Sequence, residues 1–328
     1  MQAPSFWYRP ATSPGLRAQL LAPLGWLYAA ATARRLRTGR AFKADVPVIC
    51  IGNLNAGGTG KTPTTIALIE RLIARGVVVH VVSRGHGGRL AGPVQVNERT
   101  HSAADTGDEP LLLSAFAPTW VARDRAAGVR AAQAAGAQVV LLDDGFQNPA
   151  VVKDLSIIVV DAQRGFGNGR CLPAGPLREP VSTGLARADM VLSIGPPAAQ
   201  SLFSADWHAP LPRLQGELEV LEMGMGWEGE NVLAFAGIGH PEKFFATLRS
   251  TGANVLRVEA LSDHQPFSDT LLRRLEQEAA NLGAQLVTTE KDAVRLPAAF
   301  RPKVLTLPVR LRLQEWQPLD QAFDRLGL

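Results

Sequence analysis

The chain has 328 residues, enough for two domains of the usual size of about 100–200 residues. With 46% hydrophobic and 20% charged residues, its composition is that of a globular protein and excludes a disordered or fibrous one. The net charge of +4 suits an acidic ligand, a membrane surface or nucleic acid equally. The two cysteines, Cys50 and Cys171, form neither a disulfide framework nor a metal cluster and indicate a reducing cytosolic setting.

The segment up to Ala44 is basic. It holds seven basic residues and no acidic one, and sixteen uncharged residues separate Arg17 from Arg34. A membrane-spanning helix needs about 17–25 apolar residues, and this shorter stretch contains Pro23 and Gly25. We therefore predict a helix on the cytoplasmic face of a membrane, with its basic end near anionic headgroups and four leucines on one side: Leu16, Leu20, Leu24 and Leu27. The alternative is a helix that packs on the protein's own core.

The stretch VPVICIGNLNAGGTGKTP, residues 46–63, is typical of a site for nucleotide triphosphates. Its glycines let a turn wrap closely and aim backbone N–H groups at phosphate oxygens, and the helix that follows adds the positive end of its dipole. Lys61 would reach the β- and γ-phosphates, and the Thr62 hydroxyl would bind Mg²⁺. The residues predicted to bind the nucleotide are Asn55, Ala56, Gly57, Gly58, Thr59, Gly60, Lys61 and Thr62.

One position departs from the strict pattern, which has glycine where this chain has Asn55. The context supports the prediction, because a β-branched run over 46–51 precedes the turn and an amphipathic run over 64–75 follows it. A glycine-rich turn that binds no nucleotide is the alternative.

Strand and helix patterns alternate after this loop. We predict a helix over 123–135 and strands over 77–83, 139–143, 156–161 and 190–194. Continuous apolar runs separated by helices imply a parallel sheet covered on both faces, whose ligands bind at the carboxyl ends of the strands. Ser83, Asp143 and Asp161 stand at those ends.

The alternation breaks between Ser193 and Pro212, where prolines and glycine cluster. We therefore predict an α/β fold with two domains: residues 1–212, with the N-terminal helix and the mostly parallel P-loop sheet, and residues 213–328, a smaller α/β domain. Segments 216–222 and 304–313 are expected to pair as a two-stranded linker. The elements expected between them are strands over 232–236, 255–261 and 286–288 and helices over 241–250 and 268–282.

Four carboxylates are candidates for the chemistry. Asp143 and Asp144 follow a run of Val and Leu, the arrangement by which a nucleotide-binding sheet presents a carboxylate to Mg²⁺. Asp108 and Glu109 lie in a turn that opens a helix, where either side chain would also accept hydrogen bonds from the free N–H groups of the first turn. Four carboxylates near one phosphate site repel each other unless a cation joins them, which favours Mg²⁺.

Basic groups in loops complete the candidates. His264 would assist a carboxylate in taking a hydroxyl proton if the smaller domain closes on the larger one, and an ordinary surface histidine is the alternative. Lys291 is either a second cation of the site or part of a surface salt bridge. The turn-rich loop over 165–180 is a candidate for acceptor recognition. Loop arginines are candidates for binding an acceptor phosphate: Arg84, Arg123, Arg170 and Arg178.

Eight motifs resemble, in order, those of the tetraacyldisaccharide 4′-kinases of lipid A biosynthesis: GNLNAGGTGKTP, SRGHGG, TGDEP, VARDR, LDDGFQ, GNGRCLPAGPLREP, SDHQPF and TTEKDAVRL. The resemblance covers almost the whole chain. It implies transfer of the γ-phosphoryl group of ATP to the 4′-hydroxyl of a tetraacyldisaccharide 1-phosphate, which gives lipid IVA. The implied cofactors are ATP and Mg²⁺. The implied partners are the lipid A precursor and the cytoplasmic face of the bacterial inner membrane, and no nucleic acid.

The same resemblance assigns roles to residues. Lys61, Asp108 and His264 would be catalytic, with Asp108 drawing the proton from the acceptor hydroxyl. The ligands of Mg²⁺ would be Thr62, Glu109, Asp143 and Asp144. The sugar-phosphate site would be lined by Arg84, Arg123, Gln147 and Asn168.

The chain departs from the family at three positions, since His86, Asn148 and Gln265 stand where the family often has Tyr, His and His. These departures affect substrate contacts and not the reaction class. Two rival classes remain open: a P-loop ATPase or GTPase that acts as a switch or metallochaperone, and a membrane-surface scaffold that uses nucleotide for structure. A guanine-reading N-K-x-D segment or Cys/His metal ligands would mark the first rival, and neither is evident.

Overall fold

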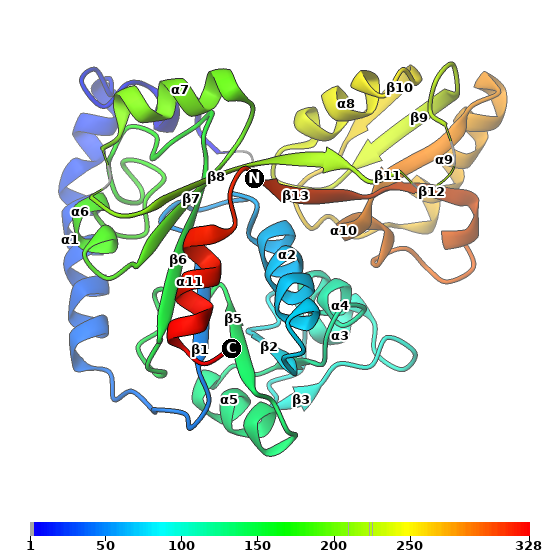
Figure 1. Cartoon of the computed structure of the whole chain (residues 1–328). Coiled ribbons are helices and arrows are strands. Elements are labelled where there is room, and N and C mark those ends of the chain that lie inside the picture. Colours follow the sequence, from blue (N-terminus) through cyan, green and yellow to red (C-terminus); the bar gives the residue numbers. More distant parts are fainter. Residues whose placement is uncertain (1–2, 209, 223, 225) are drawn as a thin grey trace.

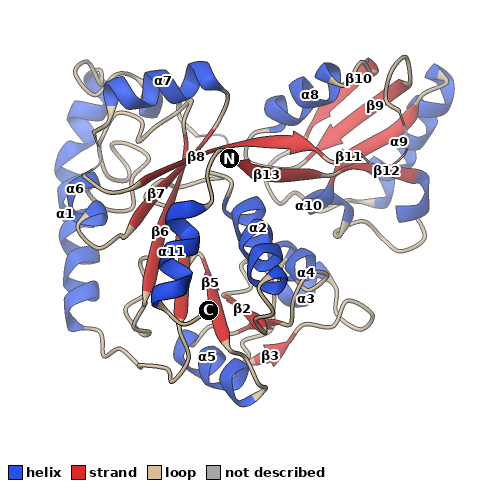
Figure 2. Ribbon diagram, viewed as in Figure 1, coloured by secondary structure: helices blue, strands red, loops and turns tan. Residues whose placement is uncertain are grey.

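The computed structural model describes residues 3–208, 210–222, 224 and 226–328, which form two sheets with helices on both faces of each (Figures 1 and 2). The larger sheet has nine strands in the order β13-β8-β7-β6-β1-β5-β2-β4-β3. Its strands are β1 (Val48–Gly52), β2 (Val79–Ser83), β3 (Val94–Gln95), β4 (Thr119–Val121), β5 (Val139–Asp143), β6 (Leu155–Asp161), β7 (Met190–Ile194), β8 (Arg213–Val220) and β13 (Val309–Leu313). Among the strands of the described residues in this sheet, only the edge pairs β13–β8 and β3–β4 are antiparallel, which confirms the prediction of a mostly parallel α/β sheet.

The helices around the large sheet divide between its faces. One face is covered by α2 (Lys61–Ala74) and α11 (Gln317–Arg325), whose apolar side chains share a core with the sheet. The opposite face is covered by α5 (Arg125–Ala134), α6 (Val181–Leu185) and α7 (Pro197–Asp206). Short helices α3 (Ala103–Thr106) and α4 (Asp108–Leu113) follow β3, and η1 (Ser5–Tyr8) precedes α1 (Leu16–Thr38).

The smaller sheet has four parallel strands in the order β10-β9-β11-β12. These are β9 (Asn231–Ala236), β10 (Asn254–Ala260), β11 (Gln285–Thr289) and β12 (Val304–Leu307). One face packs on α8 (Pro241–Ser250) and the other on α9 (Asp269–Leu282). The short helices α10 (Glu290–Ala293) and η2 (Arg301–Lys303) lie between β11 and β12. We call residues 221–308 the small unit and the remaining described residues the large unit.

The expected division at residues 212 and 213 differs from this arrangement. The extended run predicted over 304–313 splits at Pro308, which has no backbone N–H to continue a ladder. Before it, β12 pairs with β11 in the small sheet; after it, β13 pairs with β8, which also pairs with β7. The last residues then return to the large unit, where Leu319 and Phe323 of α11 are buried in its core. The small unit is therefore inserted between β8 and β13.

A second difference concerns the proline-rich segment read as a break between the domains. Half of it forms α7, which begins at Pro197. Proline is well tolerated at the first position of a helix, because its missing N–H would have no partner there. Phe203 of this helix is fully buried in the core of the large unit.

The N-terminal helix α1 presents most of its large apolar side chains to solvent, and Leu20 and Trp26 are each 71% exposed. Its small residues face the protein instead: a Cβ on Gly25 would lie 2.9 Å from the Cys171 carbonyl oxygen, so α1 packs closely on the 165–180 loop. Among the helices of the described residues, none combines the length and apolar character that a membrane crossing requires.

Candidate active site

The loop between β1 and α2 has the form of a phosphate-binding turn. Gly57 and Gly60 adopt φ values of +113° and +94°, which favour glycine, and nothing lies within 4 Å of a Cβ placed on Gly57 or Gly58. The buried Asn53 side chain braces the turn by donating hydrogen bonds to the Gly57 carbonyl (3.2 Å) and the Thr59 hydroxyl (3.1 Å). The middle of the loop is thus open, with α2 beginning at Lys61 directly behind it.

The first two residues predicted to bind nucleotide form hydrogen bonds within the protein. The Asn55 side chain donates to the Gly165 carbonyl at 3.1 Å, and the Ala56 N–H donates to the Pro176 carbonyl at 2.7 Å. Both partners lie in the 165–180 loop. Asn55 therefore replaces the glycine of the strict pattern with a side chain that ties the two loops together.

Two carboxylates stand at the end of β5, beside this loop. The Ser83 hydroxyl donates to Asp143 at 3.0 Å. Lys61 Nζ lies 3.6 Å from Asp144 Oδ1, and Arg178 contacts both oxygens of Asp144 at 3.1 Å. Burial, with the charges of Glu109 and Asp144, raises the pKa of Asp143 to about 7. Burial also opposes the charge of Asp144, but the Lys61 and Arg178 cations outweigh it and hold the pKa of Asp144 below its usual value.

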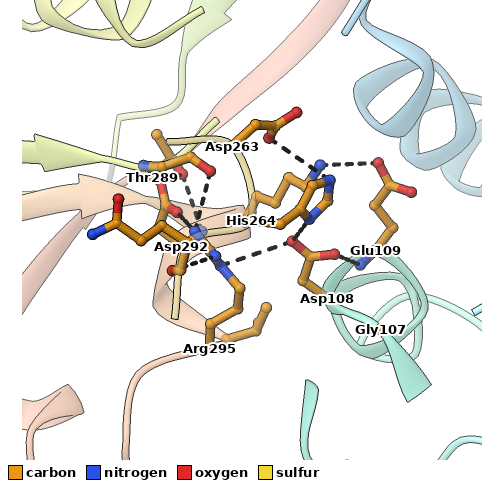
Figure 3. Close-up of polar contacts among 12 residues, drawn as sticks. Gly107, Asp108, Glu109, Asp263, His264, Thr289, Asp292 and Arg295 are labelled. Atoms are coloured by element: carbon orange, nitrogen blue, oxygen red, sulfur yellow. Dashed lines mark hydrogen bonds and ion pairs between the residues drawn. The ribbon is translucent and has the colours of Figure 1, made fainter. Parts of the chain in front are cut away.

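A carboxylate of the large unit meets a histidine of the small unit. Asp108 opens α4, and its Oδ2 lies 2.9 Å from His264 Nδ1 (Figure 3). This hydrogen bond raises the pKa of His264. Asp108 is only 4% exposed, and burial favours its neutral form, but the His264 hydrogen bond and the nearby Lys291 and Arg295 charges bring its pKa below the usual range.

Further ion pairs join the two units. Lys291 Nζ lies 3.0 Å from Glu109 Oε1, and Lys243 of α8 lies 2.6 Å from Asp161 at the end of β6. Burial disfavours the charged form of Lys291, yet the Glu109 and Asp108 carboxylates raise the pKa of Lys291 above its usual value. Lys291 is therefore one of several cations that the small unit presents to carboxylates of the large unit.

The backbone at two of these positions is unusual. Asp144 and His264 are the non-glycine residues with positive φ in the part of the chain that the structure describes, at +52° and +57°. Such conformations cost free energy and persist where the surroundings impose them, which is frequent at functional sites. Both residues belong to the site outlined above.

The predicted acceptor residues fall into two groups. Arg84 and Arg123 are exposed in loops at the ends of β2 and β4. Gln147 lies beside the acids: it donates to the Asn53 carbonyl at 2.9 Å and accepts from Arg178 at 3.5 Å. Asn168 is 2% exposed, and its amide is used inside the 165–180 loop, where it donates to the Ala174 carbonyl at 2.9 Å.

Sequence reasoning missed three features of the site. Arg178 was grouped with arginines for an acceptor phosphate, but it contacts Asp144. Asp292 and Arg295 were not singled out, although Arg295 Nε lies 3.8 Å from Asp108 Oδ2. The signal available was the acid–arginine spacing of three residues within the TTEKDAVRL motif, a spacing at which two side chains can pair within one turn of the chain.

An open glycine turn between a buried parallel strand and a helix, with acids at the neighbouring strand ends, defines the class of P-loop α/β proteins that handle nucleotide phosphates. The family model described as Tetraacyldisaccharide-1-P 4'-kinase matches residues 17–327, and the chain belongs to this family of kinases.

Individual relatives agree with this assignment. The chain is 63% identical to the Tetraacyldisaccharide 4'-kinase of Jannaschia sp. (strain CCS1), with 99% of both chains covered. It is 62% identical to the protein of that name from Dinoroseobacter shibae, over 99% of this chain and 98% of the relative. The crystal structure of LpxK from Aquifex aeolicus in complex with ATP superposes with a TM-score of 0.78, covers 95% of this chain and 99% of that chain, and is 26% identical in sequence.

Proposed function

We propose that this protein transfers the γ-phosphoryl group of ATP to the 4′-hydroxyl of a tetraacyldisaccharide 1-phosphate and so forms lipid IVA. The 2.9 Å contact between Asp108 and His264 carries the proposal, because it joins the two units at a buried carboxylate. The names of the relatives and the ATP in the Aquifex aeolicus structure support the choice of both substrates.

Asp108 belongs to the same site as the phosphate-binding turn. The charges of Glu109 and Lys61 act in opposite directions on the pKa of Asp143, so both groups lie within electrostatic reach of Asp143. Glu109 follows Asp108 directly. A triphosphate held at Lys61 therefore has a candidate base within the same cluster of charges.

Asp108 would act on the acceptor hydroxyl. Phosphoryl transfer depends mainly on positioning and on stabilising charge, so a carboxylate that orients the hydroxyl and takes its proton is sufficient as a base. The proton moves from the 4′-hydroxyl to a carboxylate oxygen of Asp108, and the hydroxyl oxygen bonds to the γ-phosphorus as the bond to the β-γ bridging oxygen breaks. His264 holds the carboxylate through Nδ1, and Lys61 carries positive charge to the phosphates.

The donor groups fit Mg²⁺. The described residues contain no cluster of three or more potential metal ligands. Mg²⁺, however, is usually bound through one or two carboxylates, with phosphates and waters completing its shell. We propose that Thr62, Glu109, Asp143 and Asp144 hold or orient it, since the Glu109 and Asp144 carboxylates lie close enough to the buried Asp143 to add to the rise that burial causes in its pKa. Bound Mg²⁺ would neutralise charge on the β- and γ-phosphate oxygens.

The acceptor is proposed to bind at the open side of this cluster. Arg84 and Arg123 are exposed and are suited to its sugar or phosphate groups. Gln147 is within reach of Arg178 and the acids. Asn168 would contribute by shaping the 165–180 loop, because its amide is already hydrogen bonded there.

We further propose that α1 lies on the cytoplasmic face of the bacterial inner membrane. The exposed Leu16, Leu20, Trp26 and Leu27 side chains support adsorption to a bilayer, and basic residues follow at the end of the helix. An acylated disaccharide does not leave a bilayer freely, because each buried CH₂ is worth about 0.8 kcal/mol. Replacing Leu20 and Leu27 by Glu should release the protein from anionic vesicles in a sedimentation assay, and unchanged sedimentation would contradict this role.

The decisive experiment is incubation with labelled ATP and a tetraacylated disaccharide 1-phosphate in mixed micelles. A labelled lipid that carries phosphate at the 4′ position supports the proposal. Label released only as inorganic phosphate, at the same rate with and without the lipid, would contradict it.

A further inference from the structure

We propose that Arg295 is a positioning residue for Asp108, and that Asp292 in turn fixes Arg295. The inference rests on the proposed role of Asp108 as the base. It concerns a group of the small unit whose side chain points toward Asp108 (Figure 3).

The Arg295 guanidinium is held rigidly. Its side chain is 9% exposed, and its terminal nitrogens donate to the Gln265 carbonyl at 3.0 Å and the Gly237 carbonyl at 3.2 Å. Its Cζ lies 4.9 Å from the centre of the Phe267 ring. A guanidinium fixed on three sides has one orientation, so its remaining N–H points in a defined direction.

Asp292 anchors this arrangement. The carboxylate is fully buried, forms a salt bridge with Arg295, and accepts hydrogen bonds from the Gly237 N–H at 3.1 Å and the Thr289 hydroxyl at 2.8 Å. Thr289 is also the N-cap of α10. The position of Arg295 is therefore set by the end of β11 and the start of α10, two regular elements of the small unit.

One donor of the guanidinium is unused. Arg295 Nε is buried, and among the described residues it has no hydrogen-bond acceptor. Buried donors are nearly always paired, since leaving one unpaired forfeits its hydration. Asp108 Oδ2 lies 3.8 Å from this nitrogen, just beyond hydrogen-bond distance. A small movement of the small unit toward α4 would close this gap.

Closing the gap would give Asp108 Oδ2 two donors, Arg295 Nε and His264 Nδ1. The other oxygen, Oδ1, accepts only the Glu109 N–H at 3.1 Å among the described residues and keeps a lone pair free. The carboxylate would then be fixed with Oδ1 toward the acceptor hydroxyl. Arg295 makes and breaks no bond in the reaction; it selects the orientation in which Asp108 works.

The test compares Arg295→Met with Arg274→Met in the full-length protein. Arg274 is a matched control, because it pairs with Glu259 on the exposed surface of the same unit. Arg295→Met should lower kcat by about 10²-fold, since a misplaced catalytic group has costs of this order. KM for ATP should change by less than about twofold, because the phosphate-binding turn is untouched. Arg274→Met should match the parent protein.

A double-mutant comparison separates positioning from general stability. If Arg295 acts through Asp108, adding Arg295→Met to Asp108→Asn should produce no further loss of kcat. An equal fractional loss in both backgrounds, or an unchanged kcat in Arg295→Met, would overturn the inference. Should Asp108→Asn itself retain full activity, the proposed base role fails first, which keeps the two failures distinct.

A conservative variant covers the case in which Arg295→Met does not fold. Arg295→Lys keeps the charge but lacks a fixed side-chain N–H at the position of Nε. It should retain the parent's melting temperature and still lower kcat by about tenfold or more, again with no effect in the Asp108→Asn background. Full activity of Arg295→Lys would show that charge alone is sufficient and would overturn the positioning role.

Discussion

The two sides of the site are built differently. The phosphate-binding side comes from one strand–loop–helix segment, residues 48–74, with Asp143 and Asp144 at the end of the adjacent strand β5. The opposite side is made of contacts between units, such as His264 with Asp108, which are 156 residues apart in the chain. The first side is fixed by the large sheet itself. The second side forms only when the small unit packs against α4. Movement of the small unit would therefore change activity through this side of the site.

The largest expected effect is that of Asp108→Ala. Removing the proposed base should lower kcat by about 10²–10⁴-fold, while ATP binding is largely kept because the phosphate-binding turn is unchanged. Steady-state kinetics with labelled ATP, together with ATP titration by calorimetry, would measure both. Near-normal turnover would refute the base role and leave the contact between the units without a catalytic purpose.

Lys61→Ala tests the other side of the site. In the proposed reaction Lys61 carries positive charge to the phosphates in both the ground state and the transition state, so we expect weaker ATP binding and a kcat lower by about 10²–10³-fold. The same kinetics and calorimetry serve here. A loss of kcat without any loss of ATP affinity would show that Lys61 acts only in the transition state.

The His264–Asp108 contact should depend on pH. The pKa of His264 is raised in the folded protein. Protonated His264 therefore stabilises the fold fully when the pH is below the ordinary pKa of histidine, and this contribution disappears as the pH rises through the raised pKa. Asp108 has a lowered pKa, so its contribution to stability is present when the pH is above the ordinary pKa of aspartate and disappears as the pH falls through the lowered pKa. The contact is therefore strongest between these two limits.

Comparing the free energies of unfolding of the parent and His264→Gln across this pH range measures the contribution. We expect these free energies to differ by about 1 kcal/mol or less, because His264 is partly exposed and solvent screens the pair. The difference should shrink as the pH rises above the raised His264 value. A difference that does not vary with pH would contradict an ionic contact.

The smallest effect is expected for Lys243→Met. Lys243 is half exposed while Asp161 is buried, so solvent screens the ion pair in part and we expect it to contribute about 1 kcal/mol. We expect faster hydrogen exchange in α8 and a KM for ATP changed by less than about threefold. Lys303→Met is the matched control, since Lys303 pairs with Glu276 inside the small unit. Equal effects of the two variants would show that Lys243 does not help to hold the units together.

The local parts of this molecule could be predicted from its sequence. The strand over 139–143, the strand over 190–194 and the helix over 241–250 were predicted with the bounds that the structure has, because apolar runs and turn residues mark their ends. The turn before Lys61 is similarly local. Family resemblance supplied the pairing of Asp108 with His264, which no local pattern contains.

The parts that escaped prediction depend on distant contacts. Pro308 divides one extended run between two sheets, and only the partners of β12 and β13 show on which side each half belongs. Arg178 reaches Asp144 because the 165–180 loop folds against the phosphate-binding turn. Arg295 lies near Asp108, which opens α4 in the other unit. Periodicity and propensity carry no information about such neighbours.

The insertion of the small unit between β8 and β13 has a consequence for how the protein is divided. Val220 and Val309 are neighbours across these two strands, so the chain leaves and re-enters the large sheet at one point. A short hairpin turn joining them would excise residues 221–308 without cutting the ladder on either side. The large unit thus shares one sheet and core between the segments before and after the insertion, and the small unit is a module inserted at a single point of that sheet.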